Sequence, residues 1–238
     1  VARSRALFGP YEADPSGPML TSYGRPELAL QKAGHGSLVS TPDGRWYLAH
    51  LAARPYSPLG PCVLGRETAI QAVDWPAGGW PRVDGGVPAE TVLPPSPMDG
   101  ASDAVLDAAP DHDGFDRPTL GPEWSTLRRP AAPDWVNLTE RESHLRVHGG
   151  QSPVGRQRPS LVARRVTARA CSLETEMEFA PATYRQLAGV TAYYNTRNWH
   201  YLCVTADDDG GPVLEVYSCD SGRITPHPAC RVELDGAG

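Results

Sequence analysis

The chain has 238 residues, enough for one large or two ordinary domains. Its net charge is −6, and acidic and basic residues are interleaved without a basic stripe, so we expect no nucleic-acid partner. No apolar run approaches the roughly 18 residues that span a bilayer, so we expect no membrane partner either.

Glycine and proline are frequent, with 24 and 25 residues, and they are spread along the chain rather than gathered in one tract. This distribution indicates many turns between short strands. No window shows the sustained apolar repeat of a long amphipathic helix. The sequence therefore predicts an all-β fold.

The chain begins abruptly. Val1–Arg5 has the character of a strand end, and Met19–Tyr23 predicts a further short strand. Since a compact domain rarely starts in mid-strand, we expect the chain to be a fragment of a longer protein, incomplete at both ends. The absence of a signal sequence therefore does not exclude secretion.

The cysteine count is odd, and no Cys-x-x-Cys pair occurs among Cys62, Cys171, Cys203, Cys219 and Cys230. Without closely spaced ligands a zinc site is not expected. We expect reduced thiols and a cytoplasmic location, with a Cys219–Cys230 disulfide as the alternative. The sequence leaves the oligomeric state open, a homo-oligomer included.

A hairpin signal lies near the start of the chain. Gly36–Ser40 and Arg45–Leu51 read as strands, and the turn between them contains Pro42 and Gly44. Proline fixes its φ and glycine takes a positive φ, which suits a tight turn. Both faces of the second strand carry apolar side chains and are expected to be buried. A longer strand is predicted over residues 64–75.

The predicted elements divide the chain into three segments. Short antiparallel strands over residues 1–82 are typical of propeller blades, and they provide one to two blades of a partial propeller. Residues 83–112 are rich in Pro and Gly and predict a linker. Residues 113–238 predict an antiparallel β-sandwich, which we expect to be incomplete. Its predicted strands are 134–139, 144–148, 160–166, 172–179, 186–194, 199–206 and 213–219.

The first module contains the motifs Gly9–Glu12, Gln31–Gly36, Gly44–Leu51, Gly65–Gln71 and Gly79–Pro81. They resemble the last part of the five-bladed propeller of glycoside hydrolase family 43. The concanavalin A-like sandwich of its β-xylosidase branch is matched by Phe115–Asp116, Gly121–Trp124, Leu127–Pro130, Ser160–Arg165 and Ala192–Asn198. The resemblance covers nearly the whole chain apart from the linker, in unbroken order.

The resemblance implies a glycoside hydrolase that cleaves O-glycosidic bonds with inversion, most closely an exo-acting β-xylosidase on xylo-oligosaccharides. The alternatives are an α-L-arabinofuranosidase of the same fold and a non-catalytic carbohydrate-binding β-module. The family's general-base Asp, general-acid Glu and third Asp lie upstream of Val1 in the family pattern. We therefore assign no catalytic acid or base to this chain and expect it to be inactive alone.

Two residues carry over from the resemblance. His35 matches the family's central histidine, which lies near a bound Ca²⁺ and its waters, and Arg66 matches an arginine that reaches the sugar. The glycines beside His35 allow close approach of the backbone, and a guanidinium offers a fork of donors that suits sugar hydroxyls. Taken alone, His35 would more often be structural and Arg66 more often an ion-pair or surface residue.

Other candidates carry less weight. His50 is expected to be structural. Turn and surface roles are favoured over catalysis for Glu67, Asp43 and Asp74. Packing within the fold is favoured over sugar stacking for Trp46, Trp75, Trp80, Tyr193, Tyr194, Trp199 and Tyr201.

Overall fold

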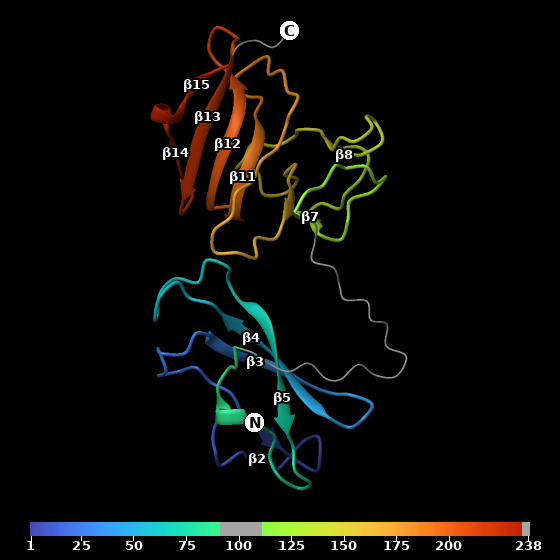
Figure 1. Ribbon diagram of the computed structural model, residues 1–238, viewed down its shortest axis with the longest axis vertical. Helices are drawn as coiled ribbons and strands as arrows, with labels where there is room; N and C mark the ends of the chain where they lie inside the picture. Colours follow the sequence, from blue (N-terminus) through green and yellow to red (C-terminus); the bar gives the residue numbers. More distant parts are fainter. Residues whose placement is uncertain (91–110, 235–238) are drawn as a thin grey trace. The chain divides into compact units, whose positions relative to one another are not determined.

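The computed structural model describes residues 1–90 and 111–234, and these are almost entirely β-structure and irregular loops (Figure 1). Residues 91–110, which form most of the predicted linker, and residues 235–238 lie outside the described residues. The all-β prediction is confirmed. In the described part of the chain, no helix is long and apolar enough to cross a membrane.

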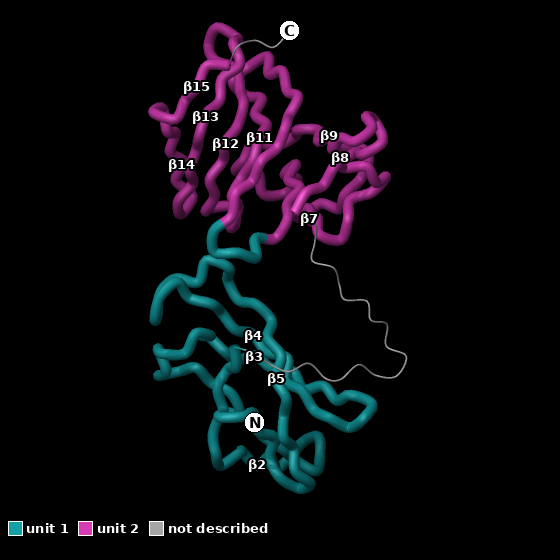
Figure 2. The backbone as a smooth tube through the Cα atoms, in the orientation of Figure 1, with its two compact units in different colours: residues 1–104, 166–170 teal, residues 105–165, 171–238 magenta. Residues whose placement is uncertain are grey.

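The chain divides into two compact units, which Figure 2 colours separately. One unit comprises Val1–Ala104 together with Val166–Ala170. The other comprises Val105–Arg165 and Cys171–Gly238. We call them unit 1 and unit 2 and describe each by itself.

Unit 1 is built on a four-stranded antiparallel sheet whose strands follow one another in sequence order. This meander is the topology of a propeller blade. Its strands are β3 (Gln31–Ser40), β4 (Trp46–Ala53), β5 (Glu67–Asp74) and β6 (Arg82–Val83), and a separate pair is formed by β1 (Ala2–Arg3) and β2 (Glu12–Ala13).

The predicted hairpin joins β3 to β4. The Thr41 N–H donates to the Arg45 carbonyl at 2.8 Å, the Gly44 N–H donates to the Thr41 carbonyl at 2.9 Å, and Gly44 has a φ of 83°. Both faces of β4 are largely buried, as expected. On one face Leu48 belongs to the apolar core of the unit, and on the other face Tyr47 is buried. The core cluster consists of Leu20, Leu48, Val73 and Val83.

Two strand predictions in unit 1 need correction. Met19–Tyr23 is not a strand, because the Thr21 hydroxyl accepts a hydrogen bond from the Tyr23 N–H at 3.1 Å and bends the chain locally. The strand predicted from residue 64 begins only at Glu67. A turn precedes it, in which the Gly65 N–H donates to the Cys62 carbonyl at 2.9 Å.

The residues that follow β6 pack on the same sheet. A short 3₁₀ turn, η1 (Asp84–Gly86), leads to Val87 and Ala89, and both of these residues bond the side chain of Gln71 on β5. The first residues of the segment predicted as a linker are therefore attached to unit 1.

Unit 2 contains a five-stranded antiparallel sheet and two short strand pairs. The predicted strands 186–194, 199–206 and 213–219 are confirmed to within two residues at each end, with tight turns between them. The sheet consists of β11 (Ala188–Asn195), β12 (Asn198–Ala206), β13 (Pro212–Asp220), β14 (Arg223–Pro226) and β15 (Val232–Glu233). The pairs are β7 (Trp124–Thr126) with β10 (Val162–Arg164) and β8 (Val136–Asn137) with β9 (Arg146–Val147). A second 3₁₀ turn, η2 (Pro228–Cys230), lies between β14 and β15.

The strand prediction for unit 2 contains one strand too many and omits three. Residues 172–179 alternate apolar and polar side chains but form no strand, and Leu173 and Met177 are exposed. Without a pairing strand, alternation alone is not enough to form one. The omitted strands are β7, β14 and β15, each of two to four residues.

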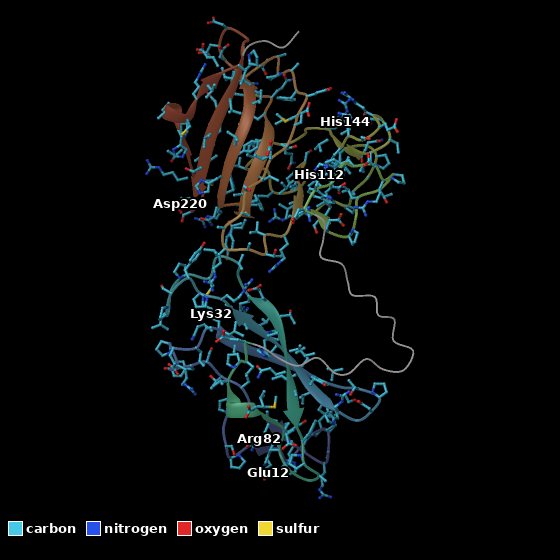
Figure 3. The ribbon with its side chains drawn as sticks, in the orientation of Figure 1. Glu12, Lys32, Arg82, His112, His144 and Asp220 are labelled. Atoms are coloured by element: carbon cyan, nitrogen blue, oxygen red, sulfur yellow. The ribbon has the colours of Figure 1, made fainter. Side chains whose placement is uncertain are left out.

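A buried carboxylate joins the N-terminal turn of unit 1 to its last strand. Arg82, labelled in Figure 3, donates from both terminal nitrogens to Asp14, at 2.9 Å for Asp14 Oδ1. Arg82 also donates to the Ser16 hydroxyl at 3.1 Å, and the Ser16 N–H donates to Asp14 at 3.0 Å. The hydrogen bonds from Arg82 hold the pKa of Asp14 below its ordinary value.

Asp14→Asn is expected to lower the melting temperature at neutral pH, because the amide cannot replace the charge-assisted pair. A carboxyl whose folded pKa is depressed contributes stability above its unfolded pKa and loses it as pH falls through the folded pKa. The difference between wild type and variant should therefore shrink below pH 3.8. Thermal unfolding followed by circular dichroism across this range measures it. Asp208→Asn, at an exposed hairpin tip, is the control, and a pH-independent difference for Asp14→Asn would contradict this account.

Candidate functional site

Strand β3 contains two bulges around the predicted Gly-His-Gly motif. Gln31 pairs with Ala53, and Gly34 with Leu51, so three residues of β3 run beside two residues of β4. The same excess recurs before the next pair, which joins Ser37 to Ala49. Bulges of this kind bend a strand and re-aim its side chains, and they are frequent beside active sites.

Each bulge contains a non-glycine residue in the left-handed region. Lys32 has a φ of 56° in the first bulge, and His35 has a φ of 52° in the second. Such backbone conformations cost on the order of 1–3 kcal/mol and cluster at functional sites. The backbone of β3 is therefore strained at His35, the residue that the resemblance assigns to the site.

Glycine occupies the two positions beside His35 for different physical reasons. Gly34 has a φ of 151°, a value that residues with side chains rarely adopt. A Cβ on Gly36 would lie 2.6 Å from Leu48 Cδ1, a distance that real Cβ atoms do not reach. Glycine is thus required at 34 for conformation and at 36 for close approach to the neighbouring strand.

The structure brings His35 and Arg66 to the same end of the sheet. Strand β4 lies between β3 and β5, and the cross-strand positions Gly34, Leu51 and Thr68 form one row. His35 follows this row by one residue on β3, and Arg66 precedes it by two residues, directly before β5. Both side chains are exposed and have no hydrogen-bond or ion-pair partner within residues 1–90 and 111–234.

Glu67, which follows Arg66, is engaged in an ion pair. Arg54 donates to its two carboxylate oxygens, from Nε at 2.8 Å and from Nη2 at 2.9 Å, and also donates to the Thr167 carbonyl within unit 1 at 3.1 Å. The hydrogen bond to Glu67 raises the pKa of Arg54. This pair fixes the start of β5 immediately after Arg66, which agrees with a structural role for Glu67.

The two other candidate carboxylates, Asp43 and Asp74, lie at the opposite end of the sheet from His35. Asp43 is bonded to Arg45 and Thr41 within the hairpin turn, and the hydrogen bond from Arg45 lowers the pKa of Asp43 to about 2. Asp74 is exposed at the last position of β5. Asp43 therefore has the turn role and Asp74 the surface position that the sequence favoured.

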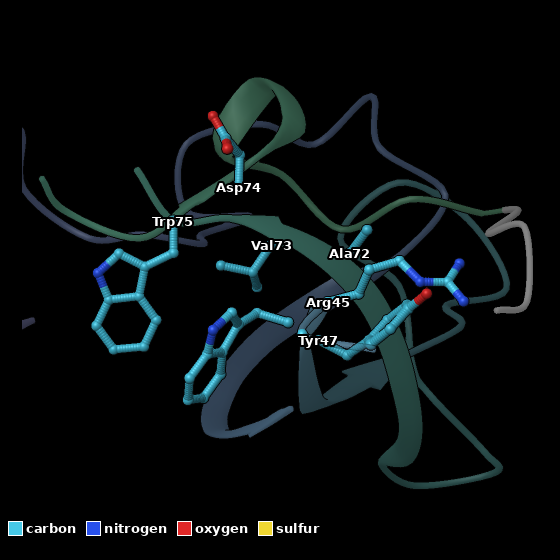
Figure 4. A pocket seen from close by; sticks show the side chains of 8 residues that line it. Arg45, Tyr47, Ala72, Val73, Asp74 and Trp75 are labelled. Carbon is cyan, nitrogen blue, oxygen red and sulfur yellow. The ribbon is translucent and has the colours of Figure 1, made fainter. Parts of the chain in front are cut away.

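A shallow pocket lies at the opposite end of the sheet, and Figure 4 shows Trp75 at one side of it and Arg45 and Tyr47 at the other. Its cavity volume is about 260 Å³. Trp46 and Trp75 meet edge to face, with ring centroids 4.7 Å apart. Since Trp46 precedes Leu51 by five residues on β4, this pocket is roughly 16 Å from the row that holds Gly34. The pocket is therefore separate from the His35 end. Its lining residues are Gly44, Arg45, Trp46, Tyr47, Ala72, Val73, Asp74 and Trp75.

The aromatic residues of the sandwich do not form one platform. Trp199 is buried on β12 and meets Tyr201 edge to face at 6.5 Å, and burial raises the pKa of Tyr201. Tyr193 shares the face of its cross-strand partner Trp199, whereas Tyr194 is 70% exposed. The arrangement agrees with packing within the sheet for Trp199 and Tyr201.

His50 is a buried structural residue, as expected. Its Nε2 lies 2.9 Å from Gln71 Oε1.

All five cysteines are unpaired, so the alternative disulfide between Cys219 and Cys230 is not formed. Burial raises the pKa of the Cys203 thiol to about 12, which leaves it unreactive.

The described residues alone do not supply a metal site. Within residues 1–90 and 111–234, no group of three or more His, Cys, Asp or Glu side chains converges on one point. Ca²⁺ needs six or more oxygen ligands, and a single exposed imidazole does not meet this requirement. A cluster of carboxylate ligands for Ca²⁺ would have to include residues outside these ranges.

These features define an all-β protein in which a propeller-type blade, with a twice-bulged strand, precedes a sandwich module. Residues 1–81 match glycosyl hydrolases family 43, and residues 112–237 match the β-xylosidase C-terminal concanavalin A-like domain. The chain belongs to glycosyl hydrolase family 43, which confirms the resemblance drawn from its motifs.

Relatives with known names cover almost the whole chain. It is 40% identical to a β-xylosidase of Bacillus subtilis over 232 residues, and 34% identical to the non-reducing end α-L-arabinofuranosidase BoGH43B of Bacteroides ovatus over 207 residues. These alignments cover 93% and 86% of this chain, but only 42% and 38% of the relatives. The crystal structure of a xylan β-1,4-xylosidase from Bacillus halodurans C-125 matches with a TM-score of 0.88 and 44% identity, over 98% of this chain and 44% of that one.

His35→Gly is expected to leave the melting temperature unchanged or to raise it slightly. A left-handed backbone conformation costs a residue with a Cβ about 1 kcal/mol more than it costs glycine, and the exposed imidazole has no described partner to lose. Thermal unfolding measures the change.

Lys32→Gly is the matched control for this prediction, because Lys32 has the same backbone conformation on the same strand. Its melting temperature should change in the same direction. A fall of about 5 °C or more for His35→Gly alone would mean that His35 serves the fold rather than a site.

Proposed function

We propose that this chain is part of an exo-acting glycosidase that removes xylose from xylo-oligosaccharides with inversion. The main support is the order of the two modules, together with 40% identity to a β-xylosidase across 93% of this chain. The chain spans about 42% of the length of that relative, so the activity is proposed for the whole protein.

Arg66 is proposed to donate hydrogen bonds to sugar hydroxyls or to a carboxylate beside the sugar. Its exposed guanidinium has no partner among the described residues, and the Arg54–Glu67 pair fixes the backbone just after it. A planar fork of donors suits both kinds of acceptor. His35, at the same end of the sheet, is proposed to act through bound water, with Ca²⁺ nearby if the rest of the protein supplies the oxygen ligands.

The acid and base of the reaction are proposed to lie outside this chain. Inversion needs two carboxyl groups roughly 6.5–9.5 Å apart, with a water between one of them and the sugar. Near His35 and Arg66, the carboxylate of Glu67 is bonded to Arg54. This carboxylate is therefore poorly suited to proton transfer.

An α-L-arabinofuranosidase is the second candidate, favoured by the 34% identity to BoGH43B. A Humicola insolens relative, 41% identical over 221 residues, is named xylosidase/arabinosidase. Comparing kcat/KM on nitrophenyl β-xyloside and nitrophenyl α-L-arabinofuranoside with the complete protein discriminates the two activities.

Arg66→Ala in the complete protein is expected to lower kcat/KM by tens-fold or more. One hydrogen bond from a charged group contributes roughly 1.5–3 kcal/mol, which corresponds to about 10- to 150-fold. Initial rates on nitrophenyl β-xyloside measure the change. Arg223→Ala, at an exposed arginine of β14, is the control. Equal kcat/KM for wild type and Arg66→Ala would remove Arg66 from the site.

The 238-residue chain alone is expected not to hydrolyse aryl xylosides, since we assign it no acid or base. Nitrophenol release by the purified chain measures this. Release that is lost on mutation of a carboxylate within the chain would overturn the assignment. Binding of xylo-oligosaccharides by the chain, with no hydrolysis by the complete protein, would favour the non-catalytic carbohydrate-binding module.

A further inference from the structure

Buried polar side chains gather around the bulged end of β3. Four of them are Ser22, Gln31, His50 and Gln71, each less than one-tenth exposed. Burying a polar group is unfavourable unless it is hydrogen-bonded. Each of the four is bonded, and together we call them the polar frame. One of these bonds, from the Ala33 N–H to Ser22, reaches the first bulge of β3.

Ser22 supports the first bulge directly. Its hydroxyl oxygen accepts a hydrogen bond from the Ala33 N–H at 3.2 Å. Ala33 lies beside Lys32 between the ladder pairs of Gln31 and Gly34, where the bulge interrupts regular pairing with β4. Ser22 therefore satisfies a donor that the bulge takes out of the ladder.

Gln31 fixes the strand just before that bulge. Its side-chain amide donates to the carbonyls of Arg25 and Leu28, at 2.8 Å each. Its backbone position pairs with Ala53, which is fully buried. Gln31 is thus fixed by its side chain and by its backbone immediately before the first bulge.

His50 lies opposite the second bulge on β4, and Gln71 bonds it from β5. His50 lies between Leu51 and Ala49, the β4 partners that flank the extra residue of β3, and so faces the His35 position across the ladder. Gln71 Nε2 donates to the Val87 carbonyl at 3.1 Å, and the Ala89 N–H donates to Gln71 Oε1 at 3.1 Å. These two bonds orient the amide of Gln71.

The oriented amide determines the role of the imidazole. Gln71 Oε1 is an acceptor, so His50 Nε2, 2.9 Å away, carries a proton and donates it. The bond from His50 Nε2 to Gln71 therefore links the ring on β4 to β5.

We propose that Ser22 and Gln31 are positioning residues for the glycosidase reaction, acting through His35. Without their bonds, the first bulge would relax toward regular pairing. Relaxation by one residue moves every following side chain to the other face of the strand, and His35 would leave its place at the sheet end. No member of the frame is assigned a contact with substrate, and the inference rests on the proposed function.

The test uses the complete protein and nitrophenyl β-xyloside, at a temperature where all variants are folded. Ser22→Ala removes the acceptor for the Ala33 N–H, and kcat/KM is expected to fall about tenfold or more. Ser22→Thr keeps a hydroxyl and should restore most of the loss. Thr205→Ala is the control, because Thr205 is an equally buried hydroxyl that bonds the Tyr184 carbonyl in unit 2. It should lower stability without lowering kcat/KM.

A double-mutant cycle separates positioning from general stability. If Ser22 acts through His35, Ser22→Ala should change kcat/KM by less than about twofold in a His35→Ala background. Full additivity of the two effects overturns the inference, as does a Ser22→Ala variant with the kcat/KM of the Thr205→Ala control. Gln31→Leu, which removes the bonds to the Arg25 and Leu28 carbonyls, provides the same cycle at the first bulge if Ser22→Ala does not fold.

The outcomes also separate the inference from the proposed function. An active wild type that loses activity in His35→Ala but keeps it in Ser22→Ala rejects the positioning role alone. A wild type that hydrolyses neither nitrophenyl β-xyloside nor nitrophenyl α-L-arabinofuranoside rejects the proposed function, and the inference with it.

Discussion

The pairing of β3 with β4 is the constraint on which the rest of unit 1 depends. Two extra residues of β3 must fit beside β4, and the strand does this with left-handed conformations at Lys32 and His35. Gly34 and Gly36 follow from that choice, one for its φ and one for its approach to Leu48. A regular strand of the same length would need neither glycine and would place His35, which follows the first bulge, on the opposite face.

The bulges also explain why the buried residues of this small sheet form an apolar part and a polar part. The Leu48 side of the sheet packs with Leu20, Val73 and Val83 in an apolar cluster that provides cohesion. The end near His35 instead buries hydrogen-bonded polar groups, which specify a conformation more than they stabilise it. A protein that only had to be stable would replace them with apolar side chains. Their presence beside a strained strand fits a site in which geometry matters more than stability.

Local signals let the sequence predict the hairpin that joins β3 to β4 and the strands β11, β12 and β13. Proline, Asp-Gly and glycine pairs act within a few residues, so one segment is enough to recognise them. The bulges were not predictable, because register depends on which residues of β4 face Gln31 and Ser37. The strand prediction over residues 172–179 was wrong for the same reason. Alternation is a property of one segment, but a strand also needs a neighbouring strand to pair with. The limits of β5 depended on the turn that ends at Gly65.

The same reasoning shows why His35 and Arg66 belong together although 31 positions separate them in the sequence. Strand β4 carries the register from Gly34 through Leu51 to Thr68, so a shift in either pairing would separate imidazole and guanidinium along the sheet. Glu67 is the anionic residue next to Arg66 in the sequence, and its carboxylate is bound by Arg54. The positive charge of Arg66 therefore remains available for a sugar or for a carboxylate from elsewhere. Under the proposed function, this sheet end would orient the glycoside, and an acid and a base from outside the chain would cleave it.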